Sequence, residues 1–98
     1  MKIVLVCNGG MSTSILMQNI EDYAKGNNLD IQADAYGLSE YEEHLDGADI
    51  LLLGPQIAYK KKSIEGTVNV PVMVVQAFDY ATGNVKNILN QIKKIKGE

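Results

Sequence analysis

The stretch Val4–Ser14, VLVCNGGMSTS, joins a strongly apolar segment to two glycines and a run of hydroxyl residues. Ile3–Cys7 is continuously apolar, which is typical of a strand buried on both faces of a parallel sheet. Cys7 is the only cysteine of the chain and stands at the end of this segment. The stretch therefore predicts a buried strand, a turn and the start of a helix, with one thiol at the junction.

Outward from this stretch, apolar runs and helical patterns alternate along the chain. Ser12 is expected to cap the first helix, because its hydroxyl can accept a hydrogen bond from a free amide of the first turn. The expected elements are a strand over Ile3–Cys7, a helix from Ser12 to about Gly26, a strand over Leu29–Tyr36, a short helix over Ser39–Leu45, a strand over Asp49–Leu53, a helix over Gln56–Ile64, a strand over Val70–Val75 and a helix from about Val85 to Ile95.

Strands that alternate with helices at this spacing indicate an α/β fold with a parallel sheet covered on both faces. Ile3–Cys7 and Asp49–Leu53 are apolar and therefore central, whereas Leu29–Tyr36 alternates and Val70–Val75 contains Pro71, so both are edge strands. We expect one domain over residues 1–98, a three-layer sandwich whose four-stranded parallel sheet has the order 2-1-3-4. Cys7 would then lie at the carboxyl end of a central strand, where such sheets open a crevice.

The composition argues against several classes of function. A net charge of -3 is unsuited to a broad nucleic-acid surface, and the run Lys60–Lys62 is expected to be a solvated helix face. One cysteine and one histidine form neither a disulfide framework nor an ordinary zinc site. The loop lacks the G-x-G-x-x-G pattern of dinucleotide binding, so no metal or cofactor is expected. A free thiol and the absence of a long apolar segment near the start predict a cytoplasmic protein.

The loop after the first strand has the features of an oxyanion site. Backbone amides at the start of a helix, together with its positive end, bind anions, and glycines let the main chain approach them closely. The same field favours thiolate over thiol at Cys7, so a phosphocysteine intermediate is the chemistry that we expect. The candidate phosphate-binding residues are Asn8, Gly9, Gly10, Met11, Ser12, Thr13 and Ser14.

The spacing of the loop also resembles that of the cysteine phosphatases, which carry C-x5-R-[ST]. Here Thr13 occupies the position of the arginine that grips the phosphoryl group, and no lysine or arginine occurs between Lys2 and Lys25. Rapid hydrolysis depends on positive charge that stabilises the transition state, so this loop is better suited to holding a phosphoryl group and passing it on. A small cysteine phosphatase and a non-catalytic anion-binding module remain the alternatives.

The loop CNGGMSTS at 7–14, the stretch ADILLLGPQIAY at 48–59 and the chain length resemble the IIB component of the lactose/cellobiose branch of the bacterial sugar phosphotransferase system. This resemblance implies a fold like that of low-molecular-weight tyrosine phosphatases and a sugar phosphotransferase activity. Cys7 would accept the phosphoryl group from a phosphohistidine of the IIA protein. It would deliver the group to a sugar held by the membrane transporter IIC, with which the protein would associate transiently. The branch implies a β-linked disaccharide such as cellobiose, chitobiose or lactose.

Other polar and aromatic residues are weaker candidates. His44 is the only histidine, and we expect it on the surface at the edge opposite Cys7. Asp79 should lie on the same rim as Cys7, where the related phosphatases have an acid followed by proline; here Tyr80 follows, and a loop or capping role is expected. The sequence does not decide whether Gln56 approaches the phosphoryl group. Four aromatic residues are candidates for docking IIA and IIC, namely Tyr36, Tyr59, Phe78 and Tyr80.

Overall fold

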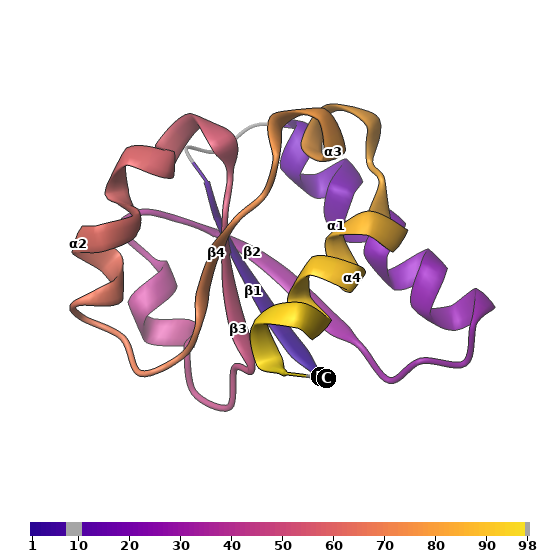
Figure 1. Ribbon diagram of the computed structural model, residues 1–98, viewed down its shortest axis with the longest axis horizontal. Helices are drawn as coiled ribbons and strands as arrows, with labels where there is room; N and C mark the ends of the chain where they lie inside the picture. The colour runs from indigo at the N-terminus through magenta and orange to yellow at the C-terminus, as the bar shows by residue number, and fades with distance from the viewer. Residues whose placement is uncertain (8–10, 98) are drawn as a thin grey trace.

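The computed structural model describes residues 1–7 and 11–97, and for residues 11–13 only the backbone. Figure 1 shows three layers, with the sheet seen nearly edge-on between α2 on one side and α1, α3 and α4 on the other. In chain order the elements are β1 Lys2–Cys7, α1 Met11–Gly26, β2 Gln32–Gly37, the 3-10 helix η1 Tyr41–His44, β3 Ile50–Leu53, the 3-10 helix η2 Pro55–Lys60, α2 Lys61–Glu65, β4 Val72–Val74, α3 Ala77–Thr82 and α4 Val85–Lys96.

The sheet confirms the predicted α/β class and the strand order. Its order is β2-β1-β3-β4, and every pairing is parallel. In register, Cys7 lies beside Gly37 of β2, while Val6 lies beside Leu53 of β3. All of β3, and β1 from Ile3 onward, is buried, as the unbroken apolar runs predict for central strands.

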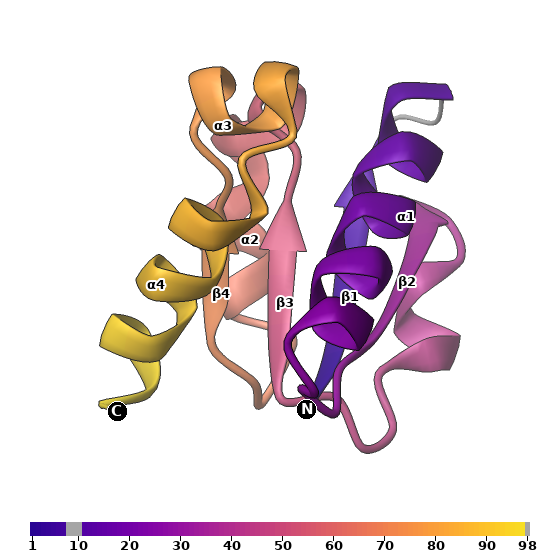
Figure 2. The same cartoon turned by 90° about the vertical axis from the view of Figure 1, so that its right-hand side faces the viewer.

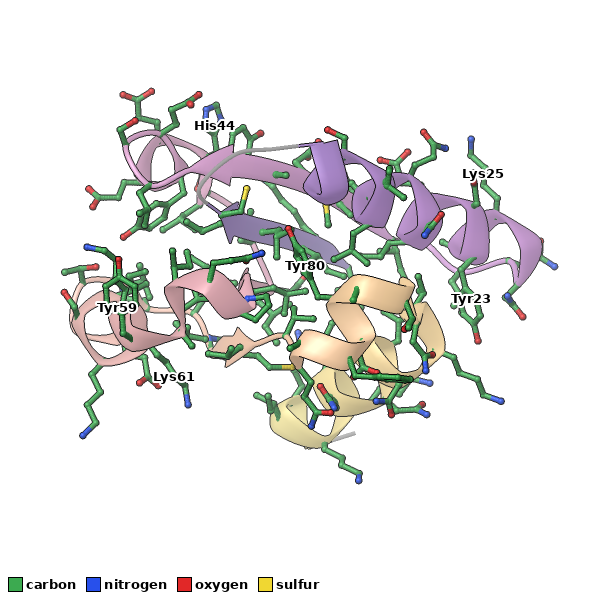
Figure 3. The ribbon with its side chains drawn as sticks, turned by 90° about the horizontal axis from the view of Figure 1, so that it is seen from above. Tyr23, Lys25, His44, Tyr59, Lys61 and Tyr80 are labelled. Atoms are coloured by element: carbon green, nitrogen blue, oxygen red, sulfur yellow. The ribbon has the colours of Figure 1, made fainter. Side chains whose placement is uncertain are left out.

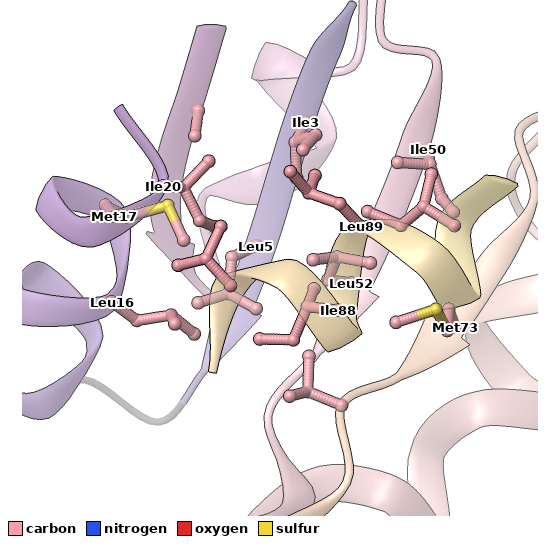
Figure 4. Packing of buried hydrophobic residues seen from close by; sticks show 14 of the residues in the cluster. Ile3, Leu5, Leu16, Met17, Ile20, Ile50, Leu52, Met73, Ile88 and Leu89 are labelled. Carbon is pink, nitrogen blue, oxygen red and sulfur yellow. The ribbon is translucent and has the colours of Figure 1, made fainter. Parts of the chain in front are cut away.

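The two faces of the sheet carry separate cores, because successive side chains of a strand point to opposite faces. On one face, Ile3 and Leu5 of β1 belong to one cluster with Ile20 of α1 and Ile88 of α4, as Figure 4 shows. On the other face, Val6 belongs to a second cluster with residues of β3, η1, η2 and α2. Both helical layers therefore pack on side chains of β1, the strand that ends at Cys7.

Several element boundaries differ from the sequence expectation. The helix expected over Gln56–Ile64 is the 3-10 helix η2 followed by α2, and Ile57 inside η2 has a non-helical conformation (φ -119°, ψ 25°). The helix expected over Ser39–Leu45 is one turn of 3-10 helix, in which only Tyr41 is buried and anchors it to the core. Short segments with a single buried anchor have too little helical periodicity for a sequence pattern to define them.

Two further differences lie beside Cys7. The first helix begins at Met11, so Ser12 is inside its first turn and is not the N-cap. Residues 77–82, expected as a loop, form α3, which ends where Gly83 adopts a positive φ of 66°. Six residues are too few to show a helical period, and this helix is stabilised by packing and by its glycine end. Within the part of the chain that the structure describes, no helix is long and apolar enough to cross a membrane.

Candidate functional site

Cys7 lies at the carboxyl edge of the sheet, where the sequence places it. It is the last residue of β1, and its neighbours along this edge are Gly37 of β2 and the turn after β3. That turn is fixed to β1, because the amide of Gly54 donates a 3.0 Å hydrogen bond to the carbonyl of Val6. Cys7 is only 5% exposed, so the thiol is held in the body of the protein rather than on a projecting loop.

The predicted phosphate-binding loop is described only in part. Asn8, Gly9 and Gly10 lie outside the described residues, and the remaining four positions, 11–14, form the first turn of α1. Amides in the first turn of a helix have no partner within the helix, and the helix dipole adds partial positive charge there. The first turn follows Cys7 closely in the chain, so the backbone arrangement is compatible with anion binding beside the thiol.

Gly54 is the point at which three side chains of this edge meet. A Cβ atom on Gly54 would lie 2.9 Å from Oε1 of Gln56 and 3.8 Å from both Cβ of Cys7 and Cε2 of Tyr80. Gln56, left open by the sequence, therefore does lie beside the cysteine, on the exposed side of the turn. Figure 3, seen from above, shows Tyr80 extending from α3 toward the end of β1.

Tyr80 lies near Cys7 in a buried position that the sequence analysis does not predict. It was expected as an exposed docking residue, but it is 9% exposed and belongs to the core cluster between the sheet, α1 and α4. The available signal was its place six residues after Val74, the end of β4, since the carboxyl ends of parallel strands meet at one edge. Its burial depends on the unexpected helix α3, which turns the ring inward.

Asp79 has neither of the two roles expected for it. It lies inside α3, is 2% exposed, and its Oδ2 accepts a 2.7 Å hydrogen bond from Nδ2 of Asn87 in α4. Its backbone carbonyl accepts from the amides of Gly83 and Asn84, which close the end of α3. The expectation of a loop or capping aspartate is therefore wrong, because tertiary packing turns the carboxylate toward α4.

His44 does not lie at the opposite edge of the sheet. Its ring stacks on that of Tyr36, with centroids 3.9 Å apart and parallel planes. Tyr36 is the register partner of Val6, one residue before Cys7. The expectation assumed a full helix running back to the amino edge, whereas η1 is only one turn long and leaves His44 beside the second half of β2.

Exposed apolar side chains surround the carboxyl edge. Ile15 of α1 is 60% exposed, Tyr59 of η2 77% and Phe78 of α3 72%, and each element follows the end of a different strand. The ammonium of Lys60 lies 5.7 Å from the centre of the Tyr59 ring. We call Ile15, Tyr59 and Phe78 the apolar rim. Of the predicted docking residues, Tyr59 and Phe78 are thus exposed, while Tyr36 is half-buried.

Among residues 1–7 and 11–97, no group of three or more histidine, cysteine, aspartate or glutamate side chains is placed to hold a metal ion. This edge carries a thiol, the amino end of a helix and polar side chains such as Gln56.

The chain matches one protein family over almost its whole length. The family described as "PTS system, Lactose/Cellobiose specific IIB subunit" matches residues 2–91. The oligo-beta-mannoside-specific EIIB component of Bacillus subtilis is 30% identical over 93 residues, covering 92% of this chain and 90% of the relative. The cellobiose-specific EIIB component of Lactococcus lactis subsp. lactis is 36% identical over 89 residues, covering 80% of each.

Solved structures agree with these matches. The cellobiose-specific phosphotransferase IIB component of Borrelia burgdorferi superposes with a TM-score of 0.78 at 36% identity, covering 97% of this chain and 90% of that one. The lactose-specific IIB domain of Streptococcus pneumoniae superposes with a TM-score of 0.79, covering 92% and 95% of the two chains. At 13% identity, the second likeness concerns the fold alone.

Proposed function

Since the chain belongs to the lactose/cellobiose-specific IIB subunits of the sugar phosphotransferase system, we propose that Cys7 carries the phosphoryl group between two partners. Members of this family are sugar phosphotransferases that work with IIA and IIC components. The observation that supports Cys7 as the carrier is its place at the carboxyl end of the central strand β1, directly before the loop that leads into α1.

In the proposed reaction, Sγ of Cys7 attacks the phosphorus of a phosphohistidine on IIA. The N–P bond breaks as the S–P bond forms, the electron pair stays on the imidazole nitrogen, and the proton of the thiol passes to that nitrogen. A sugar hydroxyl on IIC then attacks the same phosphorus, its proton passes to water, and the S–P bond breaks so that Cys7 leaves as thiolate. Asn8, Gly9, Gly10, Met11, Ser12, Thr13 and Ser14 would bind the phosphoryl oxygens through their amides and hydroxyls in both steps.

Two features favour a carrier over a phosphatase. No lysine or arginine stands near Cys7 in the sequence, between Lys2 and Lys25, to stabilise a hydrolytic transition state. Asp79, the candidate proton donor of a phosphatase mechanism, is buried and engaged by Asn87. A general acid must reach the leaving group, and a carboxylate hydrogen-bonded to a neighbouring helix is poorly placed for that.

The apolar rim is the surface that we propose for partner docking. Exposed aromatic and aliphatic side chains around a buried reactive group are typical of the centre of a protein interface. IIA and IIC must each bring a phosphohistidine or a sugar to the same cysteine, so both would cover this edge in turn. The protein would act in the cytoplasm and associate transiently with the transporter.

We infer that the sugar is a β-linked disaccharide. Relatives are named for oligo-β-mannoside, cellobiose and galactose, so the family spans several substrates. The sugar would be bound by IIC, and this chain would contribute the phosphoryl group.

The test is the intact mass of the protein after incubation with phosphoenolpyruvate, the general phosphotransferase proteins and a matching IIA. A gain of one phosphoryl group, absent in Cys7→Ser and reversed by IIC with sugar, is expected. No gain with a IIA that phosphorylates another IIB would overturn the carrier function. Hydrolysis of an aryl phosphate by the wild type, lost in Cys7→Ser, would instead support the phosphatase.

A further inference from the structure

We propose that Tyr80 shields the phosphocysteine from water, and that the hydrogen bond between Asp79 and Asn87 holds Tyr80 in place. This inference rests on the proposed function. A carrier must transfer its phosphoryl group to a sugar faster than it loses it to water. In the wasteful reaction, a water oxygen attacks phosphorus, the S–P bond breaks, and thiolate and inorganic phosphate are released.

Tyr80 and Cys7 both lie close to the turn at Gly54. The ring edge of Tyr80 and Cβ of Cys7 lie at equal distance, 3.8 Å, from the point where a Cβ of Gly54 would stand. The ring and the cysteine thus approach the same point of the turn after β3 from different elements, α3 and β1. Tyr80 is 9% exposed and Cys7 5%, so the ring is packed into the protein on this side of the site, where an apolar surface would exclude solvent from the phosphocysteine.

The helix that carries Tyr80 is short and needs an anchor. A pocket of about 140 Å³ separates part of α3 from α1, and its lining includes Ile15, Asn19 and Tyr80. α3 is therefore incompletely packed against α1, and the position of Tyr80 is set by its other contacts.

The anchor is the pair formed by Asp79 and Asn87. Asp79 directly precedes Tyr80, and its buried carboxylate accepts from Asn87 at 2.7 Å. Asn87 is itself held in the first turn of α4, where its backbone amide donates to Oδ1 of Asn84 at 3.2 Å. Breaking this pair would leave a buried carboxylate without its amide donor, which is costly, so α3 is fixed to α4. Asp79 and Asn87 are positioning residues and do not touch the phosphoryl group.

The experiment measures how long the phosphocysteine survives. Each protein is phosphorylated with IIA, separated from it, and followed by intact mass in buffer without IIC. Tyr80→Phe, which keeps the ring, should retain the wild-type lifetime. Tyr80→Leu and Asn87→Ala should shorten it by about tenfold, because water then reaches the phosphorus more readily. The exchanged pair Asp79→Asn with Asn87→Asp should restore it.

Asn90→Ala is the matched control, because Asn90 is an exposed asparagine of the same helix α4. Thermal unfolding of every variant shows that the lifetime is measured on folded protein. If Tyr80→Leu and Asn87→Ala keep the wild-type lifetime, the shield is wrong and the carrier function stands. If the wild type itself is not phosphorylated by a competent IIA, the proposed function fails, and the shield fails with it.

Discussion

The two edges of the sheet differ in what their polar groups do. At the amino edge, Asp49 accepts from the amide of Lys2 at 2.7 Å and from the ammonium of Lys96 at 3.4 Å, so it links both ends of the chain. At the carboxyl edge, the apolar rim is exposed around a buried thiol, Cys7. The amino edge thus joins the two ends of the chain through charge, although Met1 and Leu29 are exposed there, whereas the carboxyl edge surrounds a buried thiol with apolar side chains. Figure 2 shows the two edges at the bottom and the top of the molecule.

The largest effect should come from the thiol itself. Cys7→Ser replaces the nucleophile by a far weaker one, so phosphoryl transfer to sugar should fall to the background of the assay. Its unfolding midpoint in urea should stay near that of the wild type, because serine has nearly the same shape. Transfer activity that persisted in Cys7→Ser would show that the carboxyl edge does not carry the phosphoryl group on this cysteine.

The apolar rim should give the next largest effect. Phe78→Ala removes an exposed ring, and truncating an aromatic interface residue commonly costs about 1–2 kcal/mol of binding, or roughly tenfold in KM for phosphorylated IIA. Stability should change little, since the side chain is 72% exposed. The matched control is Leu29→Ala, an exposed apolar residue in the turn before β2, which should leave KM unchanged.

The turn that joins α3 to α4 should respond moderately. Gly83 has a φ of 66°, and a Cβ there would lie 2.6 Å from Nδ2 of Asn19. Gly83→Ala should therefore lower the free energy of unfolding by about 1–2 kcal/mol, measured by urea denaturation. Gly26→Ala is the control, because nothing lies within 4 Å of a Cβ at that position. Equal stability of both variants would contradict the described turn.

The smallest effect should be a pH dependence at the amino edge. The hydrogen bond from the Lys2 amide, with help from Lys96, holds the pKa of Asp49 below its usual value. The folded protein then binds this proton less readily than the unfolded chain. Ionised Asp49 therefore stabilises the folded protein above the usual aspartate pKa, and this stabilisation is lost as pH falls through the folded-state pKa.

Asp49→Asn should flatten this part of the stability curve in acid, measured by urea denaturation between neutral pH and the acid limb. Asp46→Asn removes an exposed carboxylate nearby and should keep the slope of the wild type. A slope that was unchanged in Asp49→Asn would show that Asp49 does not hold the amino edge together in the way described.

The sheet was predictable because its signals are local. The continuous apolar runs of β1 and β3 and the weaker patterns at β2 and β4 are enough to order the strands, and this order places Cys7 at the carboxyl edge. Once the order is known, the edge at which a residue lies follows from its place after a strand. The position of Gln56 beside the cysteine follows in the same way.

The remaining features depend on contacts between segments that no local pattern records. Whether Asp79 faces solvent or Asn87 depends on how α3 packs on α4. The orientation of Asp79 therefore cannot be predicted before the positions of both helices are known. The inward ring of Tyr80 has the same origin. The predicted position of His44 is wrong because the length of η1 is set by one buried residue, Tyr41, rather than by a periodic pattern.

Both described ends of the chain lie at the amino edge, where the N-terminal amine of Met1 bonds to the carbonyl of Asp30 and Lys96 bonds to Asp49. Figure 2 shows the N and C marks at this end of the molecule, away from the carboxyl edge. A tether added at either end would thus leave the cysteine uncovered. Such a tether could hold a donor or acceptor domain at high effective concentration, in either order along one polypeptide.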